Sequence, residues 1–385
     1  MKPANTYTEH LVSLSRSKLL RAISDRGCPQ GRTIRIGETQ LLNFASNDYL
    51  GLAANAVVID AASRAMLEFG LGAGASRLLS GGCTLHGELE RRVAAFKGSA
   101  AALVFNSGYT ANVSAIPALA TNKGAIFSDE LNHASIVDGC RLSGAERFVY
   151  RHGSLSHLAE LLQASHKTLK LVVTESVFSM DGDIVDIRGI HKLCKTHNAL
   201  LYIDDAHATG VLAGGRGSPA HFNIQPDENV IQMGTFSKAL GSMGGFVAAS
   251  ETIIEYLVNR ARGLMYSTAL PAPIIAASLA AINHIETNPE VVVTLHANIG
   301  NCKRLLLLRG IHVPDAPTAI VPIYVETVAE AMRISEHLLT RGIYAPAIRP
   351  PTVKQPRIRI SLSTLHSDED IERLSASLSE AIGCQ

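Results

Sequence analysis

A lysine, an aspartate and a histidine follow two apolar segments of the sequence, and together these residue types could do covalent and proton-transfer chemistry. Apolar residues 199–203 run into Asp204 and, three residues later, His207. Apolar residues 230–233 lead to Lys238, which precedes a glycine-rich stretch. Ligands of open parallel sheets bind beyond the carboxyl ends of the strands, so these positions are the first candidates for a site.

Three interpretations are open for Asp204 and His207. The carboxylate could cap a turn beside a surface histidine. Both side chains could also be metal ligands, although no further histidine or cysteine lies at a complementary short spacing. In the third interpretation the carboxylate holds a proton on a ring nitrogen, which a pyridinium cofactor requires.

Lys238 favours the third interpretation only in combination with Asp204. A lysine at a strand end is usually a solvated charge. Beside another cation or in a dry pocket, however, its amine can lose a proton and form a Schiff base with a carbonyl compound. The glycines that follow Lys238 allow a ligand to approach the backbone closely. An aspartate after one strand and a lysine after the next therefore predict a site for pyridoxal phosphate.

The phosphate of such a cofactor needs hydrogen-bond donors. Ser107, Gly108 and Tyr109 begin a predicted helix, and a helix N-terminus presents amide groups and the positive end of its dipole to an anion. Thr235 and Ser179 could add hydroxyl groups. An ordinary helix cap at Ser107 explains the first segment equally well.

Two further motifs bear on other classes of protein. Residues 70–75 match the Gly-x-Gly-x-x-Ala pattern of a dinucleotide site, but residues 61–69 predict a helix where that pattern needs a strand. No Gly-x-Ser-x-Gly motif is present, which disfavours a serine hydrolase. The alternatives of other classes are a metal hydrolase that uses Asp204, Asp205 and His207, and a non-catalytic dinucleotide-binding protein.

Short apolar runs alternate with helical patterns through the middle of the chain. This alternation predicts the α/β fold class, with a mostly parallel seven-stranded sheet covered by helices on both faces. In such a sheet the candidate polar residues meet at one edge. The seven runs are 101–105, 125–127, 147–150, 169–174, 199–203, 230–233 and 246–249.

The two ends of the chain follow a different pattern. The first residues predict a helix that includes Leu11 and Ile23 and ends near Gly27. In the C-terminal part, Ser367 and Asp370 resemble a capping box at the start of the last helix. We expect an N-terminal arm, a large domain and a small C-terminal α+β domain, over residues 1–45, 46–285 and 286–385. The elements expected after residue 285 are helices 290–309 and 328–341, strands 320–325 and 357–362, and the last helix.

Composition and charge exclude several kinds of partner. The 385 residues include 35 Lys plus Arg and 34 Asp plus Glu, so no net field attracts nucleic acid. Six scattered cysteines, Cys384 among them, and the lack of a signal peptide predict reduced thiols and a cytoplasmic protein. The uncharged segment 263–283 could span a membrane by length, but Pro271 and Pro273 predict a turn followed by a buried helix, so no membrane partner is expected.

Five segments in order along the chain resemble the α-oxoamine synthases, and the resemblance covers residues 20 to 360. This family consists of fold-type I pyridoxal phosphate enzymes that condense an amino acid with an acyl thioester and release carbon dioxide. The resemblance therefore implies a transferase with a large cofactor domain and a small C-terminal domain. The segments are Asn43–Leu52, Gly70–Gly81, Asn132–Ser135, Asp204–Gly210 and Thr235–Lys238.

The resemblance also implies a role for each matching residue. Lys238 would carry the cofactor and later act as the base for the α-proton, while Asp204 would keep the pyridine nitrogen protonated. His133 would stack on the ring and touch substrate, which makes His133, Asp204 and Lys238 the expected catalytic residues. The other expected cofactor contacts are Gly108, Tyr109, Ser179, His207, Thr235 and Thr268, the last together with Ser267 reaching the partner subunit's phosphate in a homodimer with sites at the interface.

The substrates follow from the same resemblance. Asn47 and Arg359 are the expected carboxylate anchors, because a guanidinium can grip a carboxylate with two hydrogen bonds. Residues 347–353 look like the family member that joins L-alanine to a pimeloyl group on coenzyme A or an acyl carrier protein, with Arg21 and Thr352 on the acyl side. The alternatives within the family are members that acylate glycine or serine.

Overall fold

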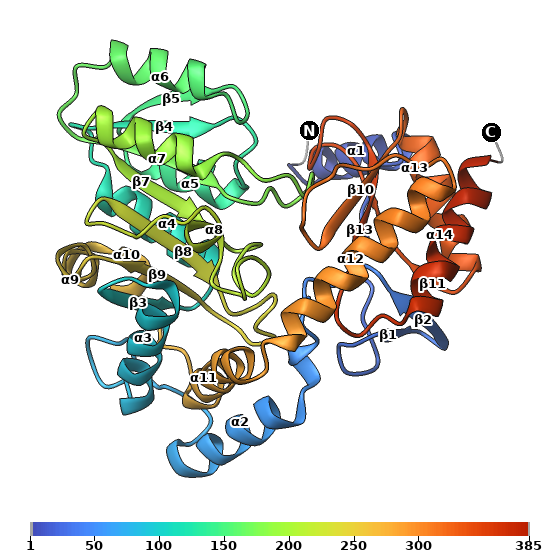
Figure 1. Ribbon diagram of the computed structural model, residues 1–385, viewed down its shortest axis with the longest axis horizontal. Coiled ribbons are helices and arrows are strands. Elements are labelled where there is room, and N and C mark those ends of the chain that lie inside the picture. Colours follow the sequence, from blue (N-terminus) through green and yellow to red (C-terminus); the bar gives the residue numbers. More distant parts are fainter. Residues whose placement is uncertain (1–2, 384–385) are drawn as a thin grey trace.

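The computed structural model describes residues 3–383, and its larger part is built around a seven-stranded sheet (Figure 1). The strand order is β3-β9-β8-β7-β6-β4-β5; β9 is antiparallel to both its neighbours and the remaining pairs are parallel. The predicted mostly parallel sheet is therefore confirmed. The strands are β3 (Ala101–Phe105), β4 (Ala125–Asp129), β5 (Glu146–Tyr150), β6 (Lys170–Glu175), β7 (Leu200–Asp204), β8 (Val230–Thr235) and β9 (Gly245–Ala249).

Helices cover both faces of this sheet. Successive side chains of a strand point to opposite faces, and here the side chains on both faces are apolar and buried. In β6, Leu171 and Val173 belong to one buried cluster and Val172 to another. The first face carries α4 (Gly108–Leu119), α5 (Ala134–Leu142), α9 (Glu251–Arg260) and α10 (Arg262–Met265). The second carries α3 (Thr84–Lys97), α6 (Leu155–Ala164), α7 (Ile187–Thr196) and α11 (Ala272–Thr287), and α2 (Ala56–Phe69) packs against α11. Two short helices, the 3-10 helix Leu52–Ala54 and α8 (Ser218–His221), lie in loops.

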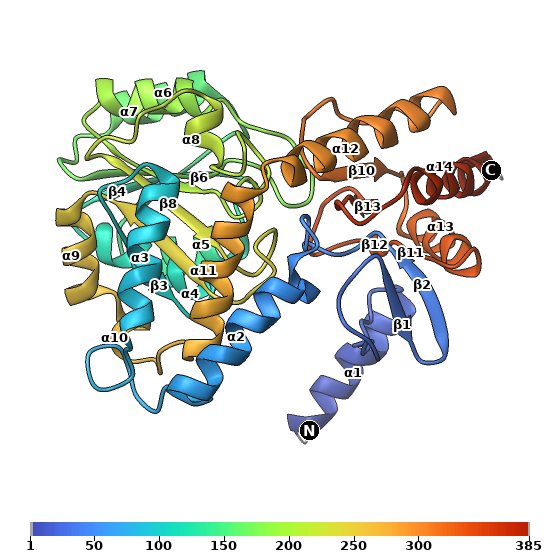
Figure 2. The same cartoon turned by 60° about the horizontal axis from the view of Figure 1, so that its bottom comes forward.

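A smaller C-terminal part stands beside the large one and is reached through the long helix α12 (Figure 2). Its sheet has the order β10-β13-β12, and a second sheet, β1-β2-β11, joins the N-terminal strands to it through the pairing of Ile343 with Leu42. Residues 33–43 are thus tied to the C-terminal part. The domain boundaries given above remain expectations from the sequence. The elements are β1 (Thr33–Ile36), β2 (Thr39–Asn43), α12 (Glu290–Leu308), β10 (Ile320–Tyr324), α13 (Val328–Thr340), β11 (Ile343–Tyr344), β12 (Ala347–Ile348), β13 (Arg357–Ser361) and α14 (Asp368–Gly383).

The expected elements of the C-terminal part are confirmed to within a residue or two at their ends. The capping box of α14 is also present, because the Asp370 amide donates to Ser367 Oγ at 3.3 Å and the Ser367 amide donates to Asp370 Oδ2 at 2.9 Å. The segment 263–283 forms a turn and then α11, as predicted, and within the described residues no helix is long and apolar enough to cross a membrane. The predicted reduced state of Cys28, Cys83, Cys140, Cys194 and Cys302 agrees with their free thiols, and Cys384 lies outside the described residues.

The N-terminal helix is shorter than predicted. Helix α1 (Pro3–Arg16) ends well before Gly27, and Lys18 has a left-handed backbone with φ 57°. Ile23 is 95% exposed, so this apolar residue has no core to hold a longer helix against. Apolar spacing alone overestimated the helix because it could not reveal that the segment lies on the surface.

Candidate active site

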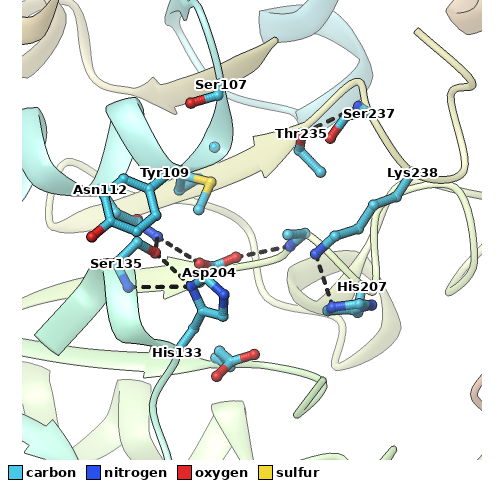
Figure 3. A pocket seen from close by; sticks show the side chains of 14 residues that line it. Ser107, Tyr109, Asn112, His133, Ser135, Asp204, His207, Thr235, Ser237 and Lys238 are labelled. Carbon is cyan, nitrogen blue, oxygen red and sulfur yellow. Dashed lines mark hydrogen bonds between the residues drawn. The ribbon is translucent and has the colours of Figure 1, made fainter. Parts of the chain in front are cut away.

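The predicted site residues at the strand ends surround one cavity of about 200 Å³ (Figure 3). Asp204 ends β7, Lys238 follows β8, and His133 immediately precedes α5. The parallel arrangement of the strands brings these residues to the same edge of the sheet, as predicted. The lining consists of Ser107, Gly108, Tyr109, Asn112, His133, Ser135, Glu175, Asp204, Ala206, His207, Met233, Thr235, Ser237 and Lys238.

Asp204 is buried and firmly oriented at the floor of this cavity. Its Oδ2 accepts a hydrogen bond from Asn112 Nδ2 at 2.8 Å, and its Oδ1 accepts one from the Ala206 amide at 3.0 Å. The Tyr202 hydroxyl donates to Asn112 Oδ1 at 2.9 Å, which turns the Asn112 amide nitrogen toward Asp204. Burial raises the pKa of Asp204, against the opposing effect of the Lys238 charge. A cation inside the cavity, such as a protonated ring nitrogen, would relieve this cost of burial.

Lys238 reaches the cavity from the loop after β8. Its Nζ lies 2.8 Å from Nε2 of His207. Burial lowers the pKa of Lys238 to about 8, although Asp204 and Glu175 favour the charged form. A lysine with this pKa is neutral in a large fraction of molecules near pH 8, so it can act as a nucleophile and as a proton acceptor.

His207 is enclosed between Lys238 and Tyr49. The Tyr49 hydroxyl lies 2.7 Å from His207 Nδ1 and donates to Asn47 Oδ1 at 3.2 Å. Burial, followed by the charge of Lys238, lowers the pKa of His207 well below its usual value. The imidazole is therefore neutral. Because the Tyr49 hydroxyl donates its proton to Asn47, it accepts from Nδ1, and Nε2 accepts a hydrogen bond from Lys238 Nζ. The metal interpretation finds no support, because within residues 3–383 no three or more His, Cys, Asp or Glu side chains are placed so that they could hold a metal ion.

His133 and the start of α4 form two other walls of the cavity. His133 Nδ1 lies 2.7 Å from Ser135 Oγ, which orients the ring where it lines the cavity, and burial lowers the pKa of His133. Ser107 caps α4 by accepting a hydrogen bond from the Thr110 amide at 3.0 Å, so the first turn of the helix faces the cavity. A Cβ atom on Gly245 would lie 2.7 Å from the Gly108 nitrogen, which explains the glycine at that point of β9.

Thr235 also lines this end of the cavity. Its Oγ1 donates to the Gly244 carbonyl at 2.7 Å and lies 2.7 Å from Ser237 Oγ. Amides of a helix start and two hydroxyl groups thus gather at one end of the cavity, opposite Asp204. This pairing of an anion site with a buried carboxylate matches the two ends of pyridoxal phosphate.

A second cavity of about 240 Å³ adjoins the first and shares His133, His207 and Lys238 with it. Arg359 from β13 and Asn47 line its far side, and Arg359 Nη2 donates to Asn47 Oδ1 at 3.1 Å. Arg359 is buried, yet its hydrogen bonds go to the Ser179 carbonyl, Ser361 Oγ and Asn47, so no carboxylate of the chain is bonded to it among the described residues. Its positive charge can therefore receive a carboxylate ligand. The other lining residues are Ala45, Ser179, Met180, Pro346 and Ile348.

Besides Asn47 and Arg359, several other predicted residues lie outside the lining of the first cavity. Ser179, expected at the cofactor, lines the second cavity instead. Arg21 and Thr352 lie outside the lining of both cavities and contact each other, with Arg21 Nη2 3.1 Å from Thr352 Oγ1. Thr268 also lies outside both linings, and its carbonyl accepts a hydrogen bond from Asn106 at 2.7 Å. The roles of these residues stay predictions.

Several lining residues were not predicted to act in the site. Glu175 ends β6, is buried, and has its pKa raised to about 8 by burial and then by Asp204. Its position after an apolar run was the only signal for it. Asn112 lies four residues inside the predicted helix start, Ser135 lies within a family motif, and Ser237 is next to Lys238. Tyr49, also within a family motif, lines neither cavity but contacts His207. No spacing rule distinguishes such residues from ordinary neighbours of a site.

Asp205, the third residue of the metal-hydrolase alternative, faces away from the cavity. Its carboxylate binds Lys97 Nζ at 2.6 Å, and both side chains are fully buried. The dinucleotide-binding alternative is wrong, because its glycine motif must follow a strand and Gly70 follows helix α2. Neither alternative finds support in the arrangement of these residues.

Comparison with known proteins agrees with the pyridoxal phosphate site inferred from the geometry. Residues 39–378 match the family model for aminotransferase class I and II. An 8-amino-7-oxononanoate synthase of Anaeromyxobacter dehalogenans is 43% identical over 375 residues, which cover 97% of this chain and 94% of that protein.

Two solved structures are similar over nearly their whole length. The serine palmitoyltransferase of Sphingomonas wittichii has a TM-score of 0.90 and 29% identity, covering 100% of this chain and 97% of that one. The 8-amino-7-oxononanoate synthase of Francisella tularensis has a TM-score of 0.79 and 28% identity, covering 89% of this chain and 98% of that one. The predicted fold and the resemblance to acyl-transferring enzymes are therefore confirmed. This chain belongs to the aminotransferase class I and II family.

Proposed function

We propose that this protein is an acyltransferase that condenses L-alanine with a pimeloyl thioester, with loss of carbon dioxide and release of the free thiol carrier. The product would be 8-amino-7-oxononanoate, a precursor of biotin. The observation that carries the proposal is the junction of two cavities at Lys238, one suited to pyridoxal phosphate and one bearing the unpaired charge of Arg359. The 43% identity to a named 8-amino-7-oxononanoate synthase supports this specificity over the serine-using alternative.

The residues of the first cavity fit pyridoxal phosphate. Asp204 has a raised pKa and a position suited to a protonated ring nitrogen, while the start of α4 and Thr235 suit the phosphate. Lys238 would hold the cofactor covalently, His133 would cover the ring, and His207 would bind the ring oxygen. When bound, pyridoxal phosphate withdraws electrons from the α-carbon of the amino acid and makes its proton removable.

The chain's own groups supply the proton transfers and the orientation. With its amine free, Lys238 Nζ could take up the α-proton, because its pKa of about 8 lies near a working pH. His207 Nε2, 2.8 Å away, keeps that amine in place. Arg359 and Asn47 hold the alanine carboxylate, which points the α-carbon toward Lys238. Ala45, Met180, Pro346 and Ile348 give the second cavity an apolar wall, which offers water no hydrogen-bond partner from their side chains.

We further propose a homodimer in which Thr268 and Ser267 reach the partner subunit's cofactor phosphate. Arg21 and Thr352 would face the acyl chain, which arrives on coenzyme A or an acyl carrier protein. A cytoplasmic location also stays a prediction. The homodimer and the acyl-side assignments rest on the family resemblance, and the location rests on the scattered cysteines and the lack of a signal peptide.

A parallel assay of amino acids and thioesters tests the proposed function. Pimeloyl, acetyl and palmitoyl thioesters would each be offered with alanine, glycine and serine, and thiol release and carbon dioxide would be measured. We expect the highest kcat/KM for alanine with pimeloyl thioester. A preference for glycine with acetyl thioester, or for serine with palmitoyl thioester, would overturn the assignment in favour of the corresponding family member.

A further inference from the structure

A charged cluster outside both cavities links the ends of strands β4 and β5 to the loop that follows the neighbouring strand β6. His152, just after β5, places Nδ1 at 3.0 Å from Asp129 Oδ1 at the end of β4. Its Nε2 lies 2.8 Å from Asp183 Oδ2, in the loop after β6. Burial opposes a charge on His152, but the hydrogen bonds and charges of the two aspartates together raise its pKa to about 10. The cluster therefore holds a positive imidazolium between two carboxylates at neutral pH.

Asp183 belongs to a short loop that we call the clamp loop, residues 178–183. The loop closes on itself, because the Phe178 amide donates to the Asp183 carbonyl at 3.1 Å and the Gly182 amide donates to the Phe178 carbonyl at 2.8 Å. The His152 ring packs edge-on against the Phe178 ring, with centroids 4.4 Å apart. One side of the clamp loop is thus fixed to the large part of the molecule through His152.

The other side of the clamp loop receives the C-terminal part of the chain. Arg359 Nε donates to the Ser179 carbonyl at 2.6 Å, and Arg357 Nη1 donates to the Met180 carbonyl at 3.1 Å. Thr318 Oγ1 donates to the Gly182 carbonyl at 2.6 Å. Gly182 has φ +67°, and a Cβ there would lie 2.3 Å from the Ile320 carbonyl oxygen, so the two parts approach closely at this residue.

Arg359 depends on this loop for its direction. With Nε fixed on the Ser179 carbonyl and Nη1 2.8 Å from Ser361 Oγ, the guanidinium plane is set and Nη2 points to Asn47 and the second cavity. We propose that His152 and Asp129, acting through Asp183, are positioning residues that hold the clamp loop and thereby aim Arg359 at the substrate carboxylate. This inference rests on the proposed function, in which Arg359 binds the alanine carboxylate.

The variant Asp183→Ala tests the inference with little damage to the fold. It cuts the link between the loop and His152, while the buried Asp129 keeps its histidine partner. We expect the dissociation constant of L-alanine, measured from the absorbance change of the holoenzyme without thioester, to rise about tenfold. The KM for alanine should rise in parallel, whereas kcat at saturating alanine and the affinity for pyridoxal phosphate should change less than about twofold.

Two companion variants sharpen the readout. Asp183→Asn keeps an oxygen for His152 and should raise the alanine dissociation constant only about threefold, because a neutral acceptor makes a weaker hydrogen bond than a charged one. Asp227→Ala is the matched control, since Asp227 binds His191 Nε2 at 3.2 Å in the same kind of pair away from the clamp loop. It should leave alanine binding unchanged.

The Arg359→Gln variant separates a failure of the inference from a failure of the proposed function. If Arg359→Gln loses alanine affinity while Asp183→Ala and Asp183→Asn bind alanine like the wild type, the positioning role is overturned and the carboxylate anchor stands. If Arg359→Gln binds alanine normally, both the anchor and the positioning role are overturned. An equal loss of alanine affinity in Asp227→Ala would also overturn the inference, because the effect would then be general.

Discussion

The two cavities at Lys238 are built in different ways. The first is formed by strand ends and helix starts of one sheet, within residues 107–238. The second combines residues near 45, the loop around Ser179 and strand β13, so three distant parts of the chain must meet. The cofactor end therefore depends on local sheet geometry, whereas the carboxylate end depends on how the C-terminal part docks. Variants at the two ends should fail in different ways.

The largest effect is expected at the junction of the cavities. Lys238→Ala removes both the amine that would hold the cofactor and the base, and general-base catalysis alone contributes about 10²–10⁴-fold. We expect kcat to fall by at least about 10³-fold with the thermal unfolding temperature unchanged, as measured by steady-state assay and thermal denaturation. Retention of most of the activity would show that the chemistry lies elsewhere.

The next effect is on stability, at the buried ion pair between Lys97 and Asp205. Lys97→Met leaves the buried Asp205 carboxylate without its partner, next to Asp204 in sequence, and should cost about 3–5 kcal/mol of unfolding free energy. The double variant Lys97→Met with Asp205→Asn should recover much of that loss, because no uncompensated charge remains. Denaturant unfolding of the two variants measures the difference. Equal destabilisation in both would mean that shape, rather than charge, stabilises this region.

Arg359→Gln tests the carboxylate end of the site, in the second cavity. Hydrogen bonds to charged groups contribute about 1.5–3 kcal/mol, so the KM for alanine should rise about 10- to 100-fold. Binding of pyridoxal phosphate to the first cavity should be unchanged, which an absorbance titration can check. A parallel loss of cofactor affinity would mean that the two cavities are not separable.

The last prediction concerns pH rather than a substitution. Burial lowers the pKa of Lys238 to about 8, so its amine is mainly charged below pH 7 and mainly neutral above pH 9. The rate of cofactor attachment to the cofactor-free protein should therefore rise about tenfold per pH unit below pH 7 and level off above pH 9. Stopped-flow absorbance between pH 6 and 10 tests this, and a rate independent of pH would contradict the assigned pKa.

The same contrast explains what the sequence could reveal. The strand ends at Asp204 and Lys238 were predictable, because short apolar runs and their polar ends are local signals. The partners of these residues were not, since Asn112 and Tyr49 reach Asp204 and His207 only through tertiary packing. The link from His152 through Asp183 to Arg359 joins segments more than 170 residues apart in sequence, which no single motif can encode. The N-terminal helix was predicted too long because its apolar residues have no partner surface.

The most direct test of the account is to identify the residue that holds the cofactor. Borohydride reduction of the holoenzyme, followed by proteolysis and peptide mass spectrometry, fixes pyridoxal phosphate to the amine that carries it. We expect one modified peptide that contains Lys238, and no such modification in the Lys238→Ala variant. A modified peptide that lacks Lys238 would contradict the central claim.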